Sequence, residues 1–82
     1  MSKSIPEVEI EMDKEFTKTR FSENLKSIRK TKNLSQESLA ELMGIQRAQV
    51  WRWESGNGNP RLDTLIKLSK ILNVQVTDLV AS

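Results

Sequence analysis

The sequence contains no cysteine and no histidine. Without cysteine the chain can form neither a disulfide nor a thiolate site, and without histidine it lacks the usual zinc ligand and acid–base catalyst. Tyrosine is absent as well, and aromatic residues make up only 5% of the chain. An active site would have to use scattered carboxylates and lysines. We therefore expect a protein that is not an enzyme, with no catalytic residues, no metal and no cofactor.

Long apolar runs are also missing. No stretch approaches the roughly 20 residues that a membrane span requires, and no signal-peptide core follows the N-terminus. We expect a cytoplasmic protein without membrane contact. The 82 residues provide for one domain. A chain of this size buries only about 60% of the surface that its unfolded form exposes, so the core must be economical.

Charge is divided unevenly along the chain. Residues 1–20 carry four basic and five acidic side chains, a net charge of −1, whereas residues 21–82 carry nine basic and six acidic side chains, a net charge of +3. A mild basic excess favours a polyanionic partner only weakly, because an ordinary solvated surface has a similar balance.

Apolar residues recur from Phe21 onward with the spacing of helices, as at Phe21, Leu25 and Ile28. The helical segments are bounded by residues that cap helices. Ser22 and Ser35 can cap a helix start, and Gly44 and Asn73 can end a helix. Arg61 is a poor cap for the fourth helix. The expected elements are a Ser22 cap to residues 30–33, a Ser35 cap to Gly44, residues 46–55, Leu62 to an Asn73 cap, and a closing turn over 74–80.

The segment before Phe21 differs in pattern. Residues 7–12, "EVEIEM", alternate charged and apolar side chains with the period of a β-strand. A single strand has no partner within this chain. Residues 1–20 are therefore expected to form an acidic arm, either mobile or docked on a second subunit or a partner protein.

Residues 36–55 form a twenty-residue unit with small and apolar residues at informative places. Ala40, its fifth residue, lets two helices cross closely, and Gly44, its ninth, can adopt the positive φ of a tight turn. The large apolar residues of the unit are expected to pack on one another and on the first helix; they are Leu39, Met43, Ile45, Val50 and Trp53. This arrangement is a helix-turn-helix that holds the third helix away from the body.

The sequence resembles the helix-turn-helix domains of the lambdoid phage repressors and Cro proteins (Xre-like). The resemblance rests on "LKSIRKTKNLSQESLAELMGI", "VWRWESG" and "NPRLDTLIKLSKILNV", and it covers about residues 21–80. It implies an all-α, five-helix domain over residues 21–82 that binds a palindromic operator in double-stranded DNA as a homodimer. The implied function is sequence-specific transcriptional regulation, with repression the first expectation, in the bacterial cytoplasm or nucleoid.

The resemblance assigns the third helix to the bases of the major groove. Arginine can bind guanine O6 and N7, and glutamine adenine N6 and N7, each through two hydrogen bonds. Ala48 can contact only a thymine methyl group. Trp51 departs from the family, so it is either a half-covered surface residue or an apolar contact with sugar, thymine or a partner. The expected base-contacting residues are Gln46, Arg47, Ala48, Trp51 and Arg52.

Other positions match family residues that hold the phosphate backbone. Gln36 matches a glutamine that braces both a phosphate and the recognition helix, and loop N–H groups with Arg61 can bind phosphates. The lysines of the first helix, Lys26, Lys30 and Lys32, are expected to be solvated, with at most long-range attraction to DNA. The expected phosphate-contacting residues are Gln36, Asn57, Gly58, Asn59 and Arg61.

Two further expectations concern structure and assembly. Glu54 matches a family glutamate that pairs with an arginine of the first helix, here Arg29, as a structural bridge. In the family the last helix and the loop before it often form the dimer contact. The candidates here are Val74, Val76, Thr77 and Val80. The alternative function is an antitoxin or adaptor whose arm, residues 1–20, binds a partner protein.

Overall fold

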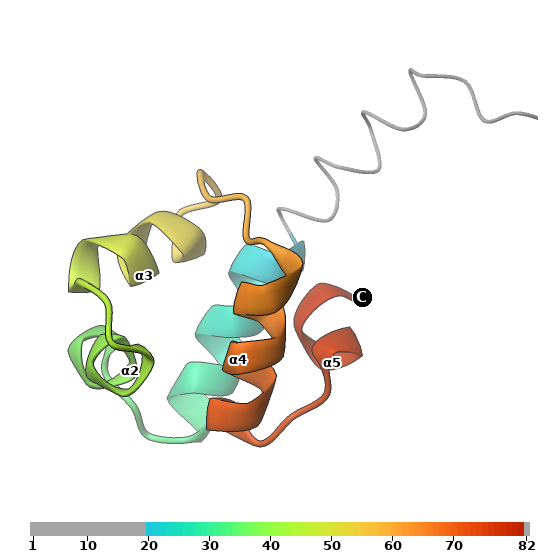
Figure 1. Cartoon of the computed structure of the whole chain (residues 1–82), viewed down its shortest axis with the longest axis horizontal. Coiled ribbons are helices and arrows are strands. Elements are labelled where there is room, and N and C mark those ends of the chain that lie inside the picture. Colours follow the sequence, from blue (N-terminus) through green and yellow to red (C-terminus); the bar gives the residue numbers. More distant parts are fainter. Residues whose placement is uncertain (1–19, 82) are drawn as a thin grey trace, which may run out of the picture.

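The computed structural model describes residues 20–81, which contain five helices and no strand (Figure 1). The predicted all-α class is therefore confirmed. The predicted arm lies almost wholly outside the described residues. The helices are the first, over residues 20–31, then α2 (Gln36–Met43), α3 (Arg47–Glu54), α4 (Leu62–Leu72) and α5 (Val76–Val80).

The first helix contradicts the prediction that Ser22 caps its start. Arg20, assigned to the arm, is already helical, and Ser22 lies inside the helix. The Ser22 side chain is buried, and its hydroxyl donates to the carbonyl oxygen of Glu54 at 2.6 Å. A buried hydroxyl needs a hydrogen-bond partner, and this serine donates to a carbonyl on another helix, whereas a cap would have accepted from an N–H of its own helix.

The predicted cap residues at both ends of α2 and at the C-terminal end of α4 are confirmed, whereas α3 and α5 are shorter than the predicted 46–55 and 74–80. Ser35 caps α2 by accepting the N–H of Ser38 at 2.9 Å. Gly44 ends α2 in the left-handed region, with φ 74°. Asn73 ends α4 in the same region, with φ 58°. As expected, Arg61 makes no side-chain hydrogen bond as a cap. At Gly44 and at Asn73 the left-handed residue reverses the chain within a short turn, so the helix that follows packs back onto the core.

The core draws on every helix. In Figure 1, α2 and α3 lie on one side of α4 and α5 lies on the other. Phe21 of the first helix meets Trp53 of α3 edge to face, with ring centroids 6.1 Å apart. This packing fixes the C-terminal end of α3 against the first helix. The buried apolar residues are Phe21, Leu25, Leu39, Ala40, Met43, Val50, Trp53, Leu68, Leu72 and Leu79.

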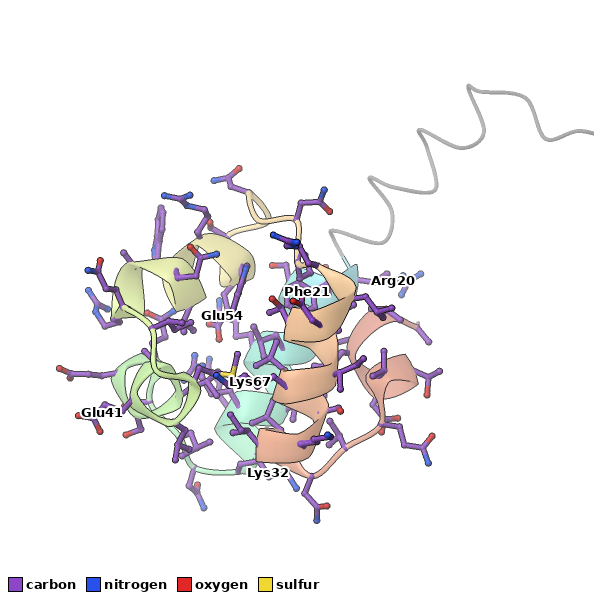
Figure 2. All side chains as sticks on the ribbon, in the orientation of Figure 1. Arg20, Phe21, Lys32, Glu41, Glu54 and Lys67 are labelled. Atoms are coloured by element: carbon purple, nitrogen blue, oxygen red, sulfur yellow. The ribbon has the colours of Figure 1, made fainter. Side chains whose placement is uncertain are left out.

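A lysine closes the junction between α2 and α4. The Nζ of Lys67 donates to the carbonyl oxygen of Met43, the last residue of α2, at 2.9 Å, and Figure 2 shows Lys67 lying between these helices. A cation is favourable there because the last carbonyl groups of a helix lack partners within it. Within residues 20–81, no helix is long and apolar enough to cross a membrane.

Candidate nucleic-acid interface

Helix α3 is held by one face and exposes the other. Val50 and Trp53 are buried in the core, at 0% and 5% exposure, whereas Trp51 is 55% exposed. Residues two positions apart on a helix are separated by roughly 200° of rotation, so Trp51 and Trp53 must face opposite ways. The outward face carries three further exposed residues, Arg47, Ala48 and Arg52. This helix can therefore offer cationic and apolar groups to a partner without disturbing the core.

Glu54, the last residue of α3, joins that helix to the first one. Arg29 donates from Nε to Oε2 at 2.6 Å and from Nη2 to Oε1 at 3.0 Å, so the ion pair expected from the resemblance is present. Both side chains are buried. Since Ser22 also donates to the Glu54 carbonyl, the first helix holds both the side chain and the main chain of this residue.

The environment of Arg29 keeps its charge fixed. The hydrogen bonds to Glu54, together with the negative charge of that carboxylate, raise the pKa of the guanidinium above its usual value, although burial acts in the opposite direction. Arg29 also donates from Nη1 to the carbonyl of Leu34 at 2.7 Å, in the segment that leads to α2. One arginine therefore ties together the first helix, the start of α2 and the end of α3.

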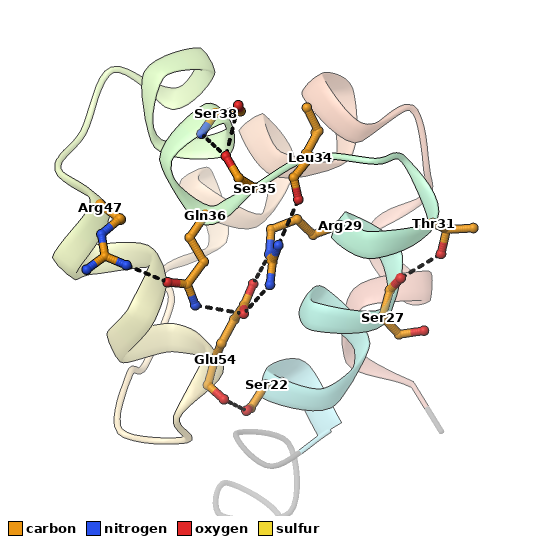
Figure 3. Close-up of polar contacts among 10 residues, drawn as sticks. All are labelled: Ser22, Ser27, Arg29, Thr31, Leu34, Ser35, Gln36, Ser38, Arg47 and Glu54. Atoms are coloured by element: carbon orange, nitrogen blue, oxygen red, sulfur yellow. Dashed lines mark hydrogen bonds and ion pairs between the residues drawn. The ribbon is translucent and has the colours of Figure 1, made fainter.

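Gln36 extends this network to the start of α3 (Figure 3). Its Nε2 donates to Oε1 of Glu54 at 3.1 Å, and its Oε1 accepts from Nη1 of Arg47 at 3.2 Å. An amide can donate two hydrogen bonds and a guanidinium five. Gln36 thus keeps one side-chain N–H, and Arg47 keeps several, for a ligand. The predicted brace between Gln36 and the recognition helix corresponds to these contacts.

The flank of α3 that faces α4 borders a hollow of about 530 Å³. Gln46, the residue before α3, is exposed at its rim with Ala48 and Arg52. The hollow carries cationic, amide and acidic side chains over an apolar floor. Its lining residues are Met43, Ile45, Gln46, Ala48, Gln49, Arg52, Trp53, Asp63, Thr64 and Lys67.

The loop after α3 divides into exposed and buried residues. Asn57, Asn59 and Arg61 are exposed, so their side chains are accessible to a ligand. Gly58 is buried, and a Cβ built there would lie 2.5 Å from Cδ1 of Trp53. The absence of a side chain at Gly58 therefore serves the packing of the loop on Trp53. Contact of its N–H with a phosphate stays a prediction.

Three of these contacts were not predicted from the sequence in this form. The Ser22–Glu54 bond joins residues that are far apart in the sequence, and the Gly58–Trp53 contact joins residues on opposite sides of a turn. No local sequence pattern indicates either contact. The Gln36–Arg47 bond was foreseeable only as a general brace. Among residues 20–81, no group of acidic side chains is arranged to hold a metal ion.

Known proteins are similar to this chain in sequence and in fold. The chain matches the sequence model of the helix-turn-helix family HTH_3 over residues 25–79. It is 44% identical over 59 residues to the control protein C.SmaI of Serratia marcescens, covering 72% of this chain and 70% of that protein. It is 39% identical over 61 residues to the transcriptional activator BcrR of Enterococcus faecalis, covering 74% of this chain but only 30% of that protein.

Several solved structures are similar over most of this chain, among them a controller protein and an enzyme. The restriction-modification controller protein C.AhdI of Aeromonas hydrophila superposes with a TM-score of 0.71 at 35% identity, covering 76% of this chain and 94% of that one. Hydroxypropylphosphonic acid epoxidase from S. wedmorenis superposes with a TM-score of 0.77 at 28% identity, covering 80% of this chain but 35% of that one. The family model matches more than half of this chain, so this protein belongs to the helix-turn-helix family HTH_3.

Proposed function

We propose that this protein is a sequence-specific regulator of transcription that binds double-stranded DNA through α3. The observation that carries the proposal is the network that links Arg29, Glu54, Gln36 and Arg47. It fixes α3 on the body while leaving the outer face of that helix exposed. The two relatives are named as a control protein and a transcriptional activator, which favours regulation over the alternative of an antitoxin or adaptor.

The proposed docking places α3 in the major groove, which at about 12 Å is wide enough for a helix. Arg47 and Arg52 reach base edges there, with Gln46 and Ala48 beside them. Gln36 and the exposed residues of the loop, Asn57 and Arg61 among them, bind phosphates on the two sides of the groove. Such a protein acts in the compartment that holds the chromosome, the bacterial cytoplasm or nucleoid.

A homodimer on a palindromic operator completes the proposal. A chain with a single recognition helix reads few base pairs, and two copies related by a twofold axis double the length of DNA that is read. The α5 region remains the proposed contact. Thr77 is exposed there, and Val74, Val76 and Val80 are half-buried, so each leaves part of its surface for a second chain.

Selection from randomised duplex DNA with the purified protein tests this function, followed by the sedimentation mass of the complex. We expect a palindromic consensus with two chains bound. Arg47→Ala should relax the preference at one base position at a cost of about 1–3 kcal/mol, whereas Arg61→Ala should weaken all sequences alike. The proposal fails if no sequence is enriched at low salt, or if both variants bind and select as the wild type does.

A further inference from the structure

A second, smaller hollow lies on another flank of α3. Its volume is about 140 Å³, and it opens between α3, the start of α2 and the first helix. Trp51 is the exposed tryptophan of α3, and Lys26 is an exposed lysine of the first helix. Neither belongs to the hydrogen-bonded network described above. The residues that line the hollow are Lys26, Gln36, Trp51, Glu54 and Ser55.

The groups around this hollow suit an anion with an apolar neighbour. Lys26 supplies a positive charge, the indole N–H of Trp51 is a donor, and Gln36 keeps one amide N–H. The carboxylate of Glu54 is the negative group of the lining, but both of its oxygens accept hydrogen bonds from Arg29 (Figure 3). Since Arg29 neutralises Glu54, the charge left at the hollow is that of Lys26. A phosphodiester with its deoxyribose combines an anion and an apolar surface in this way.

The position of the hollow also suits the DNA backbone. An α-helix with its side chains is about 10–12 Å across and fills the width of the major groove, so a sugar–phosphate strand runs along each of its flanks. The hollow that contains Arg52 and Thr64 lies on the flank toward α4. The hollow that contains Lys26 and Trp51 lies on the flank toward the first helix and α2. Each flank of α3 therefore has a recess for one strand.

We propose that Trp51 and Lys26 together hold one phosphodiester and its sugar in the smaller hollow. The indole ring packs on the deoxyribose and donates its N–H to a phosphate oxygen, which Lys26 neutralises. Trp51 is then a residue that positions the backbone and does not read a base, and Lys26 is a direct contact. This inference rests on the proposed binding of DNA by α3. It replaces the expected base contact of Trp51 with the alternative of a sugar contact, adds a phosphate contact for its indole N–H, and departs from the expectation that Lys26 is only solvated.

Three single variants test the proposal in the full chain: Lys26→Met, Trp51→Ala and, as a matched control, Lys30→Met. Lys30 is an exposed lysine of the same helix and is absent from the lining of the hollow. Because all three side chains are exposed, the variants should fold, which urea unfolding verifies. The affinity of each is measured over a series of salt concentrations for the selected operator and for an unrelated duplex of the same length.

We expect Lys26→Met and Trp51→Ala to weaken both duplexes by similar factors and to leave the selected consensus unchanged. Lys26→Met should reduce the slope of log K against log salt by about 0.9, the value for one phosphate contact, whereas Lys30→Met should change it less. A neutral methylphosphonate placed at successive backbone positions should identify one position whose effect on the wild type is lost in Lys26→Met.

Other results overturn the proposal and can be told apart from failure of the proposed function. If Trp51→Ala alters the consensus at one base pair but binds the unrelated duplex as the wild type does, Trp51 reads a base. If both variants bind like the wild type while Arg47→Ala still relaxes the consensus, α3 docks on DNA but the hollow holds no phosphate. If the wild type binds no duplex, the proposed function and this inference fail together.

Discussion

At the scale of single residues, Gly58 shows how a loop position can be fixed by packing. Its φ lies outside the left-handed region, so the backbone does not demand glycine there. The demand comes from Trp53, whose Cδ1 would lie 2.5 Å and whose Cα would lie 3.1 Å from an added Cβ. Neighbouring Gly56 is the reverse case, because its φ is 85° and nothing lies within 4 Å of its Cβ position.

This contrast predicts different tolerances at the two glycines. Gly58→Ala should lower the free energy of unfolding by about 1–3 kcal/mol, because the loop or the indole must move to admit the methyl group. Gly56→Asn should cost less, because asparagine tolerates the left-handed region and the space is open. Urea unfolding of both variants measures the difference. Equal stability of Gly58→Ala and the wild type would contradict a close packing of this loop on Trp53.

Residues also differ in how far the sequence could predict their roles. The ion pair of Arg29 and Glu54 and the exposure of Trp51 followed from family resemblance and from helical spacing. The Ser22 hydroxyl was assigned to a cap because a serine near an apolar run suggests a helix start. The hydroxyl instead donates to the carbonyl oxygen of Glu54, 32 positions away. Local pattern cannot distinguish a cap from a contact of this range.

At the scale of helices, ends were easier to predict than starts. Gly44 and Asn73 end their helices in a backbone conformation that few residues adopt readily, so the residue type itself carries the signal. Helix α3 begins without a side-chain cap that could mark it, because Gln46 makes no such hydrogen bond. Capping of the last carbonyl of α2 by Lys67 depends on the packing of α4, and no sequence signal within α2 indicates it.

Because the Arg29–Glu54 ion pair connects the first helix to α3, removing one of its two partners should strongly lower the free energy of unfolding. Arg29→Met leaves the Glu54 carboxylate buried without its cation, which should lower the free energy of unfolding by about 3–5 kcal/mol. In the double variant Arg29→Met, Glu54→Leu no buried charge remains, so most of the stability should return. DNA affinity should stay reduced in the double variant, because Gln36 loses the acceptor that orients it toward Arg47.

Urea unfolding and operator binding, measured together on the wild type and both variants, separate these two effects. Recovery of stability without recovery of affinity would assign the pair a positioning role toward α3. Unfolding of Arg29→Met at the urea concentration of the wild type would show instead that the buried pair contributes little to the fold.

At the scale of the whole molecule, the fold class and the helix-turn-helix followed from the sequence, whereas the two hollows beside α3 did not. A hollow depends on how side chains from several helices meet, as where Lys26 of the first helix and Trp51 of α3 line the same recess. The spacing of residues along one helix does not indicate which side chains of other helices they will lie beside. The exposed apolar residues of α2 and α4 were likewise not foreseen; Leu42 and Leu62 are 54% and 67% exposed.

The proposed dimer predicts the effect of a charge in α5. Thr77→Arg places a cation on an exposed residue of α5, where the twofold axis would bring it close to its own copy. We expect a folded monomer whose affinity for the palindromic operator falls toward that for a half-site. Sedimentation gives the mass, and Thr31→Arg, an exposed threonine of the first helix, adds the same charge away from α5. A dimer of undiminished mass would exclude α5 as the contact.

The hydrogen bond between Gln36 and Arg47 limits how the DNA preference of this protein can be redesigned. A new side chain at position 47 must still donate to the Gln36 amide, or that amide keeps only its hydrogen bond to Glu54 and is no longer tied to the start of α3. Ala48 has no side-chain polar group, and the Arg52 guanidinium is exposed on the outer face of α3, so neither position carries such an obligation. Libraries that vary residues 48 and 52 and retain Arg47 should therefore yield folded proteins with altered specificity more often than libraries that vary position 47.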